Sequence, residues 1–138
     1  MPFLTDADYR KIIKDVALSQ IIEGDVTIRT DCELATQKEI ESYLNHDFDV
    51  LNIFNKVGAA RDPVIVMYMA DMVVFHLLSR VAPQKVPGLR QDRYNAAKLW
   101  LKAVGRGDIR PDLPLRSLEN KPNTLTRFGS NTKFGSNY

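Results

Sequence analysis

A chain of 138 residues, 44% of them apolar, is long enough for one domain with a single modest core. Its one cysteine, Cys32, excludes an internal disulfide and a multi-thiolate metal site, and it is typical of a reducing compartment. The net charge of +2 is unevenly distributed, because residues 1–60 carry 11 acidic and 6 basic side chains whereas residues 61–138 carry 6 and 13. Such a split either orients the protein toward charged partners or copies of itself, or reflects a chance scatter of surface charge.

The first predicted helix spans residues 5–23. Thr5 and Asp8 have the spacing of a capping box, and Glu23-Gly24 is a stop signal. Between them, apolar residues recur at helical spacing: Tyr9, Ile12, Ile13, Val16, Ile21 and Ile22. The opening residues lack a basic start followed by an apolar run, so we expect no secretion signal.

A second helix is predicted from a cap at Thr30 or Asp31 to about His46. Its buried side is expected to carry Leu34, Ile40, Tyr43 and Leu44. The connection over residues 47–61 is expected to tuck its apolar side chains under the bundle: Phe48, Val50, Leu51, Ile53 and Phe54.

The third helix is predicted over residues 63–81, because Asp62-Pro63 is a strong start signal. It is apolar almost all round and approaches the length of a membrane span. However, Asp71 lies at its middle, where an acid costs about 3 kcal/mol on insertion scales, so we expect a buried central helix and no membrane. Asp71 and His76 are about 140° apart around the helix, and we expect each to form structural hydrogen bonds within the fold or with a neighbouring subunit.

The fourth helix is predicted from a cap at Asp92 to about Gly105. Its apolar stripe consists of Tyr94, Ala97, Leu101 and Val104, with Trp100 beside them. Basic residues crowd this helix and its flanks: Arg90, Arg93, Lys98, Lys102, Arg106 and Arg110. A solvated helix face is the preferred interpretation, and a DNA-facing or inter-subunit surface is the alternative.

Other candidate sites carry weak signals. His46, Asp47 and Asp49 lack a recurrent ligand spacing, so no metal is expected there. The adhesion-like tripeptide at residues 106–108 is interpreted as a helix-ending turn. The sequence contains no phosphate-binding glycine loop, no nucleophile elbow and no catalytic carboxylate pair with a histidine, so neither an enzyme nor a cofactor is expected.

Taken together, the patterns predict an all-α fold, with a four-helix bundle over residues 1–110 and an extended C-terminal arm over residues 111–138. Pro111 and Pro114 exclude a helix at the start of the arm. The arm then repeats a basic residue followed by Phe-Gly-Ser-Asn, beginning at Arg127 and at Lys133.

In an extended strand, residues six apart point the same way and lie about 20 Å apart. Phe128 and Phe134 would then present two aromatic side chains on one side, and Gly129 and Gly135 would let the backbone approach a partner closely. Such a segment suits addition to the edge of a partner's sheet. The alternative interpretation is a disordered, solubilising tail.

The chain resembles the small helical head–tail connector, adaptor or head-completion proteins of tailed bacteriophages. The resemblance rests on FLTDADY, IESYLNHDFDV, MYMADMVVFHLLSR, RYNAAKLWLKAVGRGDIRPDLPL and RFGSNTKFGSNY, which follow one another over nearly the whole chain. The fourth of these motifs is the most specific. The doubled tail motif departs from the single copy expected in the family.

The resemblance implies a structural protein of the virion neck, made in the bacterial cytoplasm. It would form a homo-oligomeric ring, a dodecamer, beneath the portal protein or beside other neck or tail proteins, with passive contact to DNA in the lumen. The arm would dock on the portal through residues that the resemblance and the repeat single out: Arg127, Phe128, Gly129, Lys133, Phe134, Gly135 and Tyr138. Asp71 and Arg80 match an acid and a base of the family without an assigned role.

Overall fold

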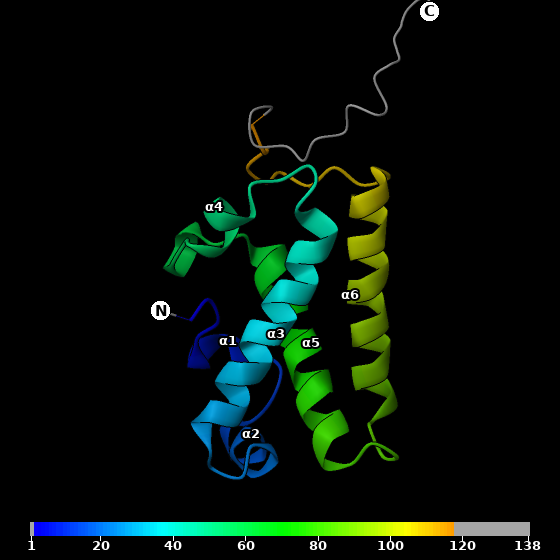
Figure 1. The fold of residues 1–138 in the computed structure, drawn as a ribbon. Helices are drawn as coiled ribbons and strands as arrows, with labels where there is room; N and C mark the ends of the chain where they lie inside the picture. The colour runs from blue at the N-terminus through cyan, green and yellow to red at the C-terminus, as the bar shows by residue number, and fades with distance from the viewer. Residues whose placement is uncertain (1, 118–138) are drawn as a thin grey trace, which may run out of the picture.

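The computed structural model describes residues 2–117, which form an all-α domain (Figure 1). Its body consists of three long helices, α3 (Val26–Leu44), α5 (Pro63–Val81) and α6 (Gly88–Arg106). The shorter elements are α1 (Asp6–Arg10), α2 (Asp15–Ile21), α4 (Val50–Phe54) and the 3-10 turn η1 (Gly58–Ala60). Among the described residues there is no strand, only an isolated antiparallel bridge between Phe48 and Leu115.

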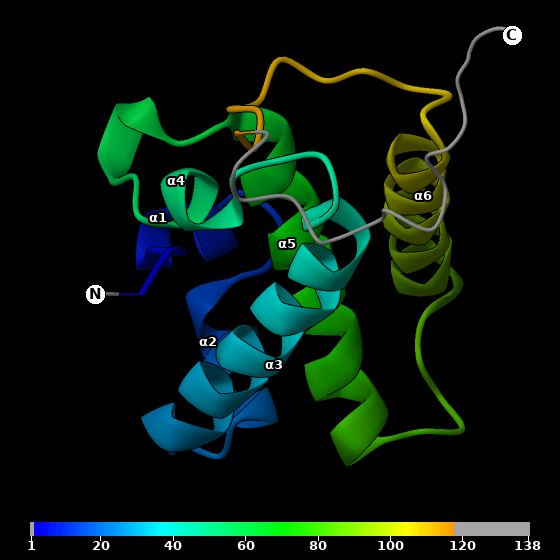
Figure 2. The ribbon, with the colours of Figure 1, turned by 45° about the horizontal axis from the view of Figure 1, so that its top comes forward.

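Helix α5 is the central element, as its sequence predicts. The Asp62 side chain accepts hydrogen bonds from the backbone nitrogens of Val64 (2.9 Å) and Ile65 (3.0 Å), and Pro63 occupies the first turn. Of the described helices, α5 is the one with the length and apolarity of a membrane span. In the fold it packs against α1, α2, α3 and α6, so α5 lies at the centre of the domain and its apolar side chains contribute to the core (Figure 2).

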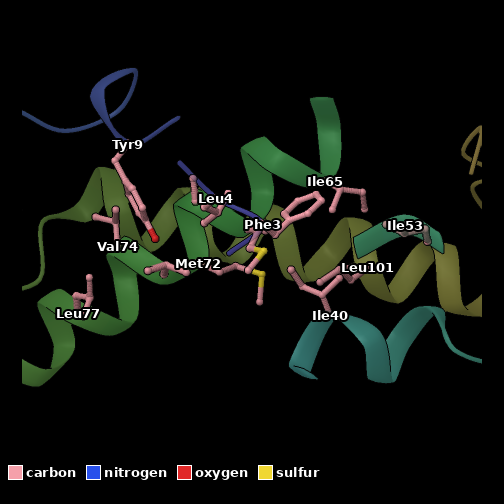
Figure 3. Packing of buried hydrophobic residues seen from close by; sticks show 14 of the residues in the cluster. Phe3, Leu4, Tyr9, Ile40, Ile53, Ile65, Met72, Val74, Leu77 and Leu101 are labelled. Atoms are coloured by element: carbon pink, nitrogen blue, oxygen red, sulfur yellow. The ribbon is translucent and has the colours of Figure 1, made fainter. Parts of the chain in front are cut away.

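The core lies where α3, α5 and α6 meet, with α1 and the N-terminal segment closing one side. Figure 3 shows Met72 of α5 near Phe3 and Leu4, and Leu101 of α6 near Ile40 of α3. All five side chains are buried. At about 25 cal/mol per Å² of apolar area removed from water, burial of this kind is the main stabilising contribution to the domain.

The first predicted helix is in fact two short helices, α1 and α2, joined by a turn. The carbonyl oxygen of Ile12 in this turn accepts a hydrogen bond from the Arg90 guanidinium of α6 instead of a helical amide. The chain therefore changes direction, and Val16, predicted on the buried stripe, is 70% exposed. The predicted stop is confirmed, because Gly24 has a left-handed backbone (φ +71°).

Two further helix starts lie earlier than predicted. Helix α3 is capped by Asp25, whose side chain accepts from the Thr27 amide, so Thr30 and Asp31 lie within the helix. Helix α6 begins after Pro87, so Asp92 lies within it. Proline is compatible with the start of a helix, because the first amides have no intrahelical acceptor.

The predicted buried positions are confirmed with exceptions. Ile40 and Leu44 of α3 are buried, but Leu34 is exposed. In the 47–61 connection, Phe48 and Ile53 are buried, whereas Leu51 is exposed. Buried residues of α6 include Ala97, Leu101 and Val104 of the predicted stripe; Tyr94 and Trp100 are half-buried, and Gly107 ends the helix with φ +85°.

Candidate interaction surfaces

The basic residues at the start of α6 are largely used inside the fold. The Arg90 side chain reaches the Ile12 carbonyl across the bundle, and Arg93 forms an ion pair with Asp71 of α5 (Nη1–Oδ1 3.3 Å). Burial raises the pKa of Asp71 above its usual range, although the guanidinium of Arg93 acts in the opposite direction. These two arginines therefore hold α6 against its neighbours, and Arg90 in particular is a poor candidate for a phosphate contact.

Lys98 is also an internal contact. Its Nζ lies 2.8 Å from Glu39 Oε2 of α3, and His76 Nε2 lies 3.2 Å from Glu39 Oε1. Burial alone would raise the pKa of Glu39, but the hydrogen bonds from Lys98 and His76 outweigh it and the pKa lies below its ordinary value. The pKa of Lys98 is raised, first by the hydrogen bond to Glu39 and then by one involving Tyr43. One carboxylate thus ties α3 to both α5 and α6.

Asp71 and His76 therefore face different helices, as their spacing predicts. Asp71 contacts α6 through Arg93, and His76 contacts α3 through Glu39. Both groups form hydrogen bonds within the fold. Arg80, near the end of α5, pairs with Glu23 at 3.2 Å on the surface.

Lys102, Arg106 and Arg110 of the predicted basic set are exposed, and Arg93 is exposed in part despite its ion pair. Arg106 Nε lies 3.0 Å from Asp108 Oδ2 within the turn that ends α6. The adhesion-like tripeptide is thus a closing turn of the helix. The basic surface of α6 is smaller than the sequence alone indicates.

The side chains of His46, Asp47 and Asp49, at which no metal was expected, do not point toward a common centre. His46 Nδ1 lies 3.0 Å from Asp47 Oδ1, while Asp49 caps α4 through the Asn52 amide. Within residues 2–117, no three His, Cys, Asp or Glu side chains form a group that could hold a metal ion.

The segment after α6 crosses the end of the bundle in an extended path and is pinned there. The Asp49 amide donates to the Pro114 carbonyl (2.9 Å), and the Arg116 amide donates to the Asp47 carbonyl (3.0 Å). Leu113, within this segment, is buried. A hollow of about 700 Å³ lies along this segment, lined by residues that include Val104 and Ile109. The described part of the predicted arm, residues 111–117, thus lies against the helices.

The residues predicted to dock on a partner lie outside the described residues: Arg127, Phe128, Gly129, Lys133, Phe134, Gly135 and Tyr138. What the structure establishes is the place from which this segment starts. That place is the end of the domain where α3 finishes and α4 begins (Figure 1).

Sequence patterns alone did not identify a buried ion pair beside α1. Arg61 donates through Nη2 to Asp8 Oδ1 (3.1 Å) and through Nη1 to the Phe3 carbonyl (2.8 Å). Burial alone would raise the pKa of Asp8, but the hydrogen bonds from Arg61 and Thr5 outweigh it and hold the pKa below its usual range. The capping-box spacing finds Asp8, but nothing local in the sequence indicates its partner 53 residues away.

A second unpredicted polar contact lies within the core. The Tyr9 hydroxyl donates to the buried Glu33 carboxylate, and burial raises the pKa of Glu33. Its place could have been found, because Glu33, Thr36 and Ile40 follow one another at helical spacing on the buried side of α3.

Exposed apolar side chains are frequent in the described domain. Those at least half exposed are Val16, Val26, Leu34, Leu51, Val57, Val81, Leu89, Leu99 and Leu115. Scattered apolar side chains are normal on a surface, whereas a helix face that combines them with charge of one sign is a candidate contact with another protein. Leu34 on α3 lies one turn from both Asp31 and Lys38, and Leu99 on α6 lies two turns after Asp92 and one turn before Lys102, so each leucine has exposed charges of both signs beside it.

No family model, curated protein or solved structure matches this chain. The connection to phage connector proteins is therefore a prediction from the motifs in the sequence.

Proposed function

We propose that this chain is a structural ring protein of a bacteriophage neck. In this proposal the helical domain is a connector-type bundle that packs against its copies in a ring, a dodecamer. The arm, residues 111–138, docks on the portal or on the next neck component. The protein would lie at the head–tail interface of the virion. DNA leaving the capsid would pass through the lumen of the ring, and the ring would contact this DNA only passively.

The observation that best supports this proposal is the pinned root of the arm. Residues 111–116 do not return into the core as a fourth long element. Two backbone hydrogen bonds and the buried Leu113 fix them across one end of the bundle. In a ring, the arm of every copy would therefore leave the helical domain from the same end of the domain. Many arms with the same direction can act together, so modest individual contacts give a durable joint.

The contacts of α6 count against the alternative, a DNA-binding module. Phosphate binding depends on cations that can reach the nucleic acid, and each contact increases the sensitivity of binding to salt. Arg90 and Lys98 are engaged within the fold, and Arg93 is partly engaged. Lys102, Arg106 and Arg110 are the exposed cations of the predicted set that these contacts do not engage.

The test is light scattering of the purified chain alone and mixed with the portal protein of the same phage. We expect the full-length chain to join the portal and a 1–119 truncation to stay free while keeping its helical circular dichroism. Replacing both Phe128 and Phe134 by alanine should have the effect of the truncation. Thr132→Ala, within the same segment, is the matched control and should bind normally.

An opposite result would change the assignment. If neither form joins the portal, the connector proposal is wrong. Tight binding of duplex DNA that falls steeply with salt, and that is lost when Lys102 and Arg106 are neutralised, would then favour the DNA-binding module.

A further inference from the structure

The segment after α6 has one backbone edge that the helical domain does not use. The two backbone hydrogen bonds that pin this segment lie on either side of the bridge between Phe48 and Leu115, so these two residues face each other as a non-hydrogen-bonded antiparallel pair. In such a pair, the amide and the carbonyl of Leu115 point to the opposite edge. Within residues 2–117, neither of these two groups forms a hydrogen bond. They form the open edge, which is able to pair with one more strand.

The hollow of about 700 Å³ lies beside this open edge. Its lining includes three buried side chains, Phe48, Val104 and Leu113, and two exposed ones, Leu115 (73%) and Ile109 (38%). Apolar side chains around a hollow are stabilised when a further apolar side chain covers them, by about 25 cal/mol per Å² removed from water. The site therefore offers both backbone groups for a strand and an apolar seat for one of its side chains.

Beyond Ser117, the sequence has the pattern of a turn followed by a short strand. Residues 118–123 end in Pro122-Asn123, and proline followed by asparagine favours a turn. Residues 124–128, Thr-Leu-Thr-Arg-Phe, are rich in the residue types that strands prefer and contain neither glycine nor proline. Residues 129–131, Gly-Ser-Asn, then punctuate the pattern. This is the order of elements that returns a chain beside the strand it has just left.

We propose that residues 124–128 turn back and pair with the open edge of the same chain, with the Phe128 side chain over the hollow. In the register that places residues 118–123 in the turn, Thr126 lies opposite Leu115, and the two residues exchange both backbone hydrogen bonds. Phe128 is two residues farther on, so it lies on the same face of the strand as the residue opposite Leu115. It is the aromatic side chain of this segment that the hollow receives.

The occupant is a segment of the same chain because of where the described chain ends. Ser117 directly follows Arg116, which lines the hollow, and 21 residues continue from there. The six residues 118–123 are ample for a reversal, since neighbouring strands lie only about 4.8 Å apart. A short tether also gives the returning strand an effective concentration of about millimolar, which a separate partner would have to match.

This pairing assigns different roles to the two copies of the tail motif. The first copy, with Phe128, is a contact within the domain. The second copy, with Phe134, is left to reach a partner, and this last assignment rests on the proposed function. The strand pairing itself requires neither a ring nor a portal.

The experiment is amide hydrogen exchange measured by nuclear magnetic resonance on the full-length chain and on the 1–119 truncation. We expect the Leu115 amide to exchange about tenfold or more slowly in the full-length chain, because only that chain contains its acceptor. The Arg116 amide is the internal control. It donates to the Asp47 carbonyl within the domain (3.0 Å), so it should be equally protected in both proteins.

Two pairs of full-length variants identify the strand. Thr126→Pro removes the amide that donates to Leu115, so the protection should be lost, whereas Asn131→Pro, beyond the strand, should keep it. Phe128→Ala should reduce the protection, because the hollow loses its occupant, and Phe134→Ala should leave it unchanged.

Two results would overturn the proposal. The first is a Leu115 amide that exchanges equally fast in the full-length chain and in the 1–119 truncation. The second is protection that appears only as the protein concentration rises, which would mean that the strand comes from another copy. Light scattering with the portal is a separate measurement, so a full-length chain that binds the portal without protecting Leu115 contradicts the strand pairing and leaves the neck assignment standing.

Discussion

Individual polar residues in this domain hold elements together across long distances in the chain. Arg61 joins Asp8 and the Phe3 carbonyl, and Arg90 joins α6 to the Ile12 carbonyl. The sequence reveals one partner of each contact at most. Asp8 is visible as part of a capping box, but a cation 53 residues away has no local signature. Non-local pairing is the kind of information that helical periodicity does not contain.

Replacing Arg61 by alanine should destabilise the domain by about 3 kcal/mol, because it leaves the Asp8 carboxylate buried without its cation. Asp8 is 4% exposed. Urea unfolding followed by circular dichroism measures the change. Arg10→Ala is the matched control, because Arg10 pairs with Asp15 on the surface (3.1 Å) and its loss should cost less than about 1 kcal/mol. If both variants lose the same free energy of unfolding, the buried Arg61–Asp8 pair stabilises the domain no more than a surface ion pair does.

The same pair predicts a pH dependence. The pKa of Asp8 is lower in the folded state than in the unfolded chain, so its contribution to stability is present above the unfolded pKa and is lost as the pH falls through the folded one. The difference in unfolding free energy between wild type and Arg61→Ala should therefore be largest near pH 7 and shrink toward pH 2. Urea unfolding of both proteins across this range measures it. A constant difference would contradict the proposed role of the charge.

At the scale of elements, the start of a helix is predicted correctly where one residue both caps the helix and precedes an apolar run. Asp62-Pro63 satisfies both conditions, and α5 was predicted with its bounds. The starts of α3 and α6 were placed too late, because polar residues on the solvent side of a helix look like caps. The first helix was predicted as one piece because Ile12 and Ile13 continue the apolar pattern through a turn that a tertiary contact stabilises.

The two competing cap assignments make different predictions for stability. Asp62→Ala removes a side chain that accepts from two backbone amides, so it should cost about 1 kcal/mol. Asp92→Ala should cost less than about 0.5 kcal/mol, because Asp92 is an exposed residue within α6 and caps nothing. Thermal and urea unfolding of the two variants provide the comparison. A cap-sized loss from Asp92→Ala would place the start of α6 where the sequence alone suggested.

At the scale of the whole molecule, the all-α class follows from the sequence, but the surfaces do not. Counting charges shows that the two halves of the chain differ in sign, yet it does not show which cations are used internally. Arg90 and Lys98 belong to that group, whereas Lys102 is exposed. Leu34 was predicted to be buried, but it is 58% exposed on the side of α3 that faces away from α6.

The proposed function predicts that ring assembly strengthens attachment to the portal. A synthetic peptide of residues 111–138 carries one arm without the helical domain, so it should bind the portal through that arm only. Simultaneous engagement of several arms raises apparent affinity by about 10²–10⁴, so we expect the peptide to dissociate from immobilised portal at least 100-fold faster than the full-length chain. Surface plasmon resonance measures both rates, with the same peptide carrying alanine at Phe128 and Phe134 as the control that should not bind.

Each outcome of this comparison identifies a different physical cause. Equal dissociation rates would mean that one arm carries the whole joint and that multivalency contributes nothing. Failure of the peptide to bind, at concentrations well above those that the full-length chain requires, would mean that the portal recognises a surface of the helical domain or of the assembled ring instead of the arm. Slow dissociation of the full-length chain with weak, measurable binding of the peptide is the result expected when many weak arms with the same direction act on one partner.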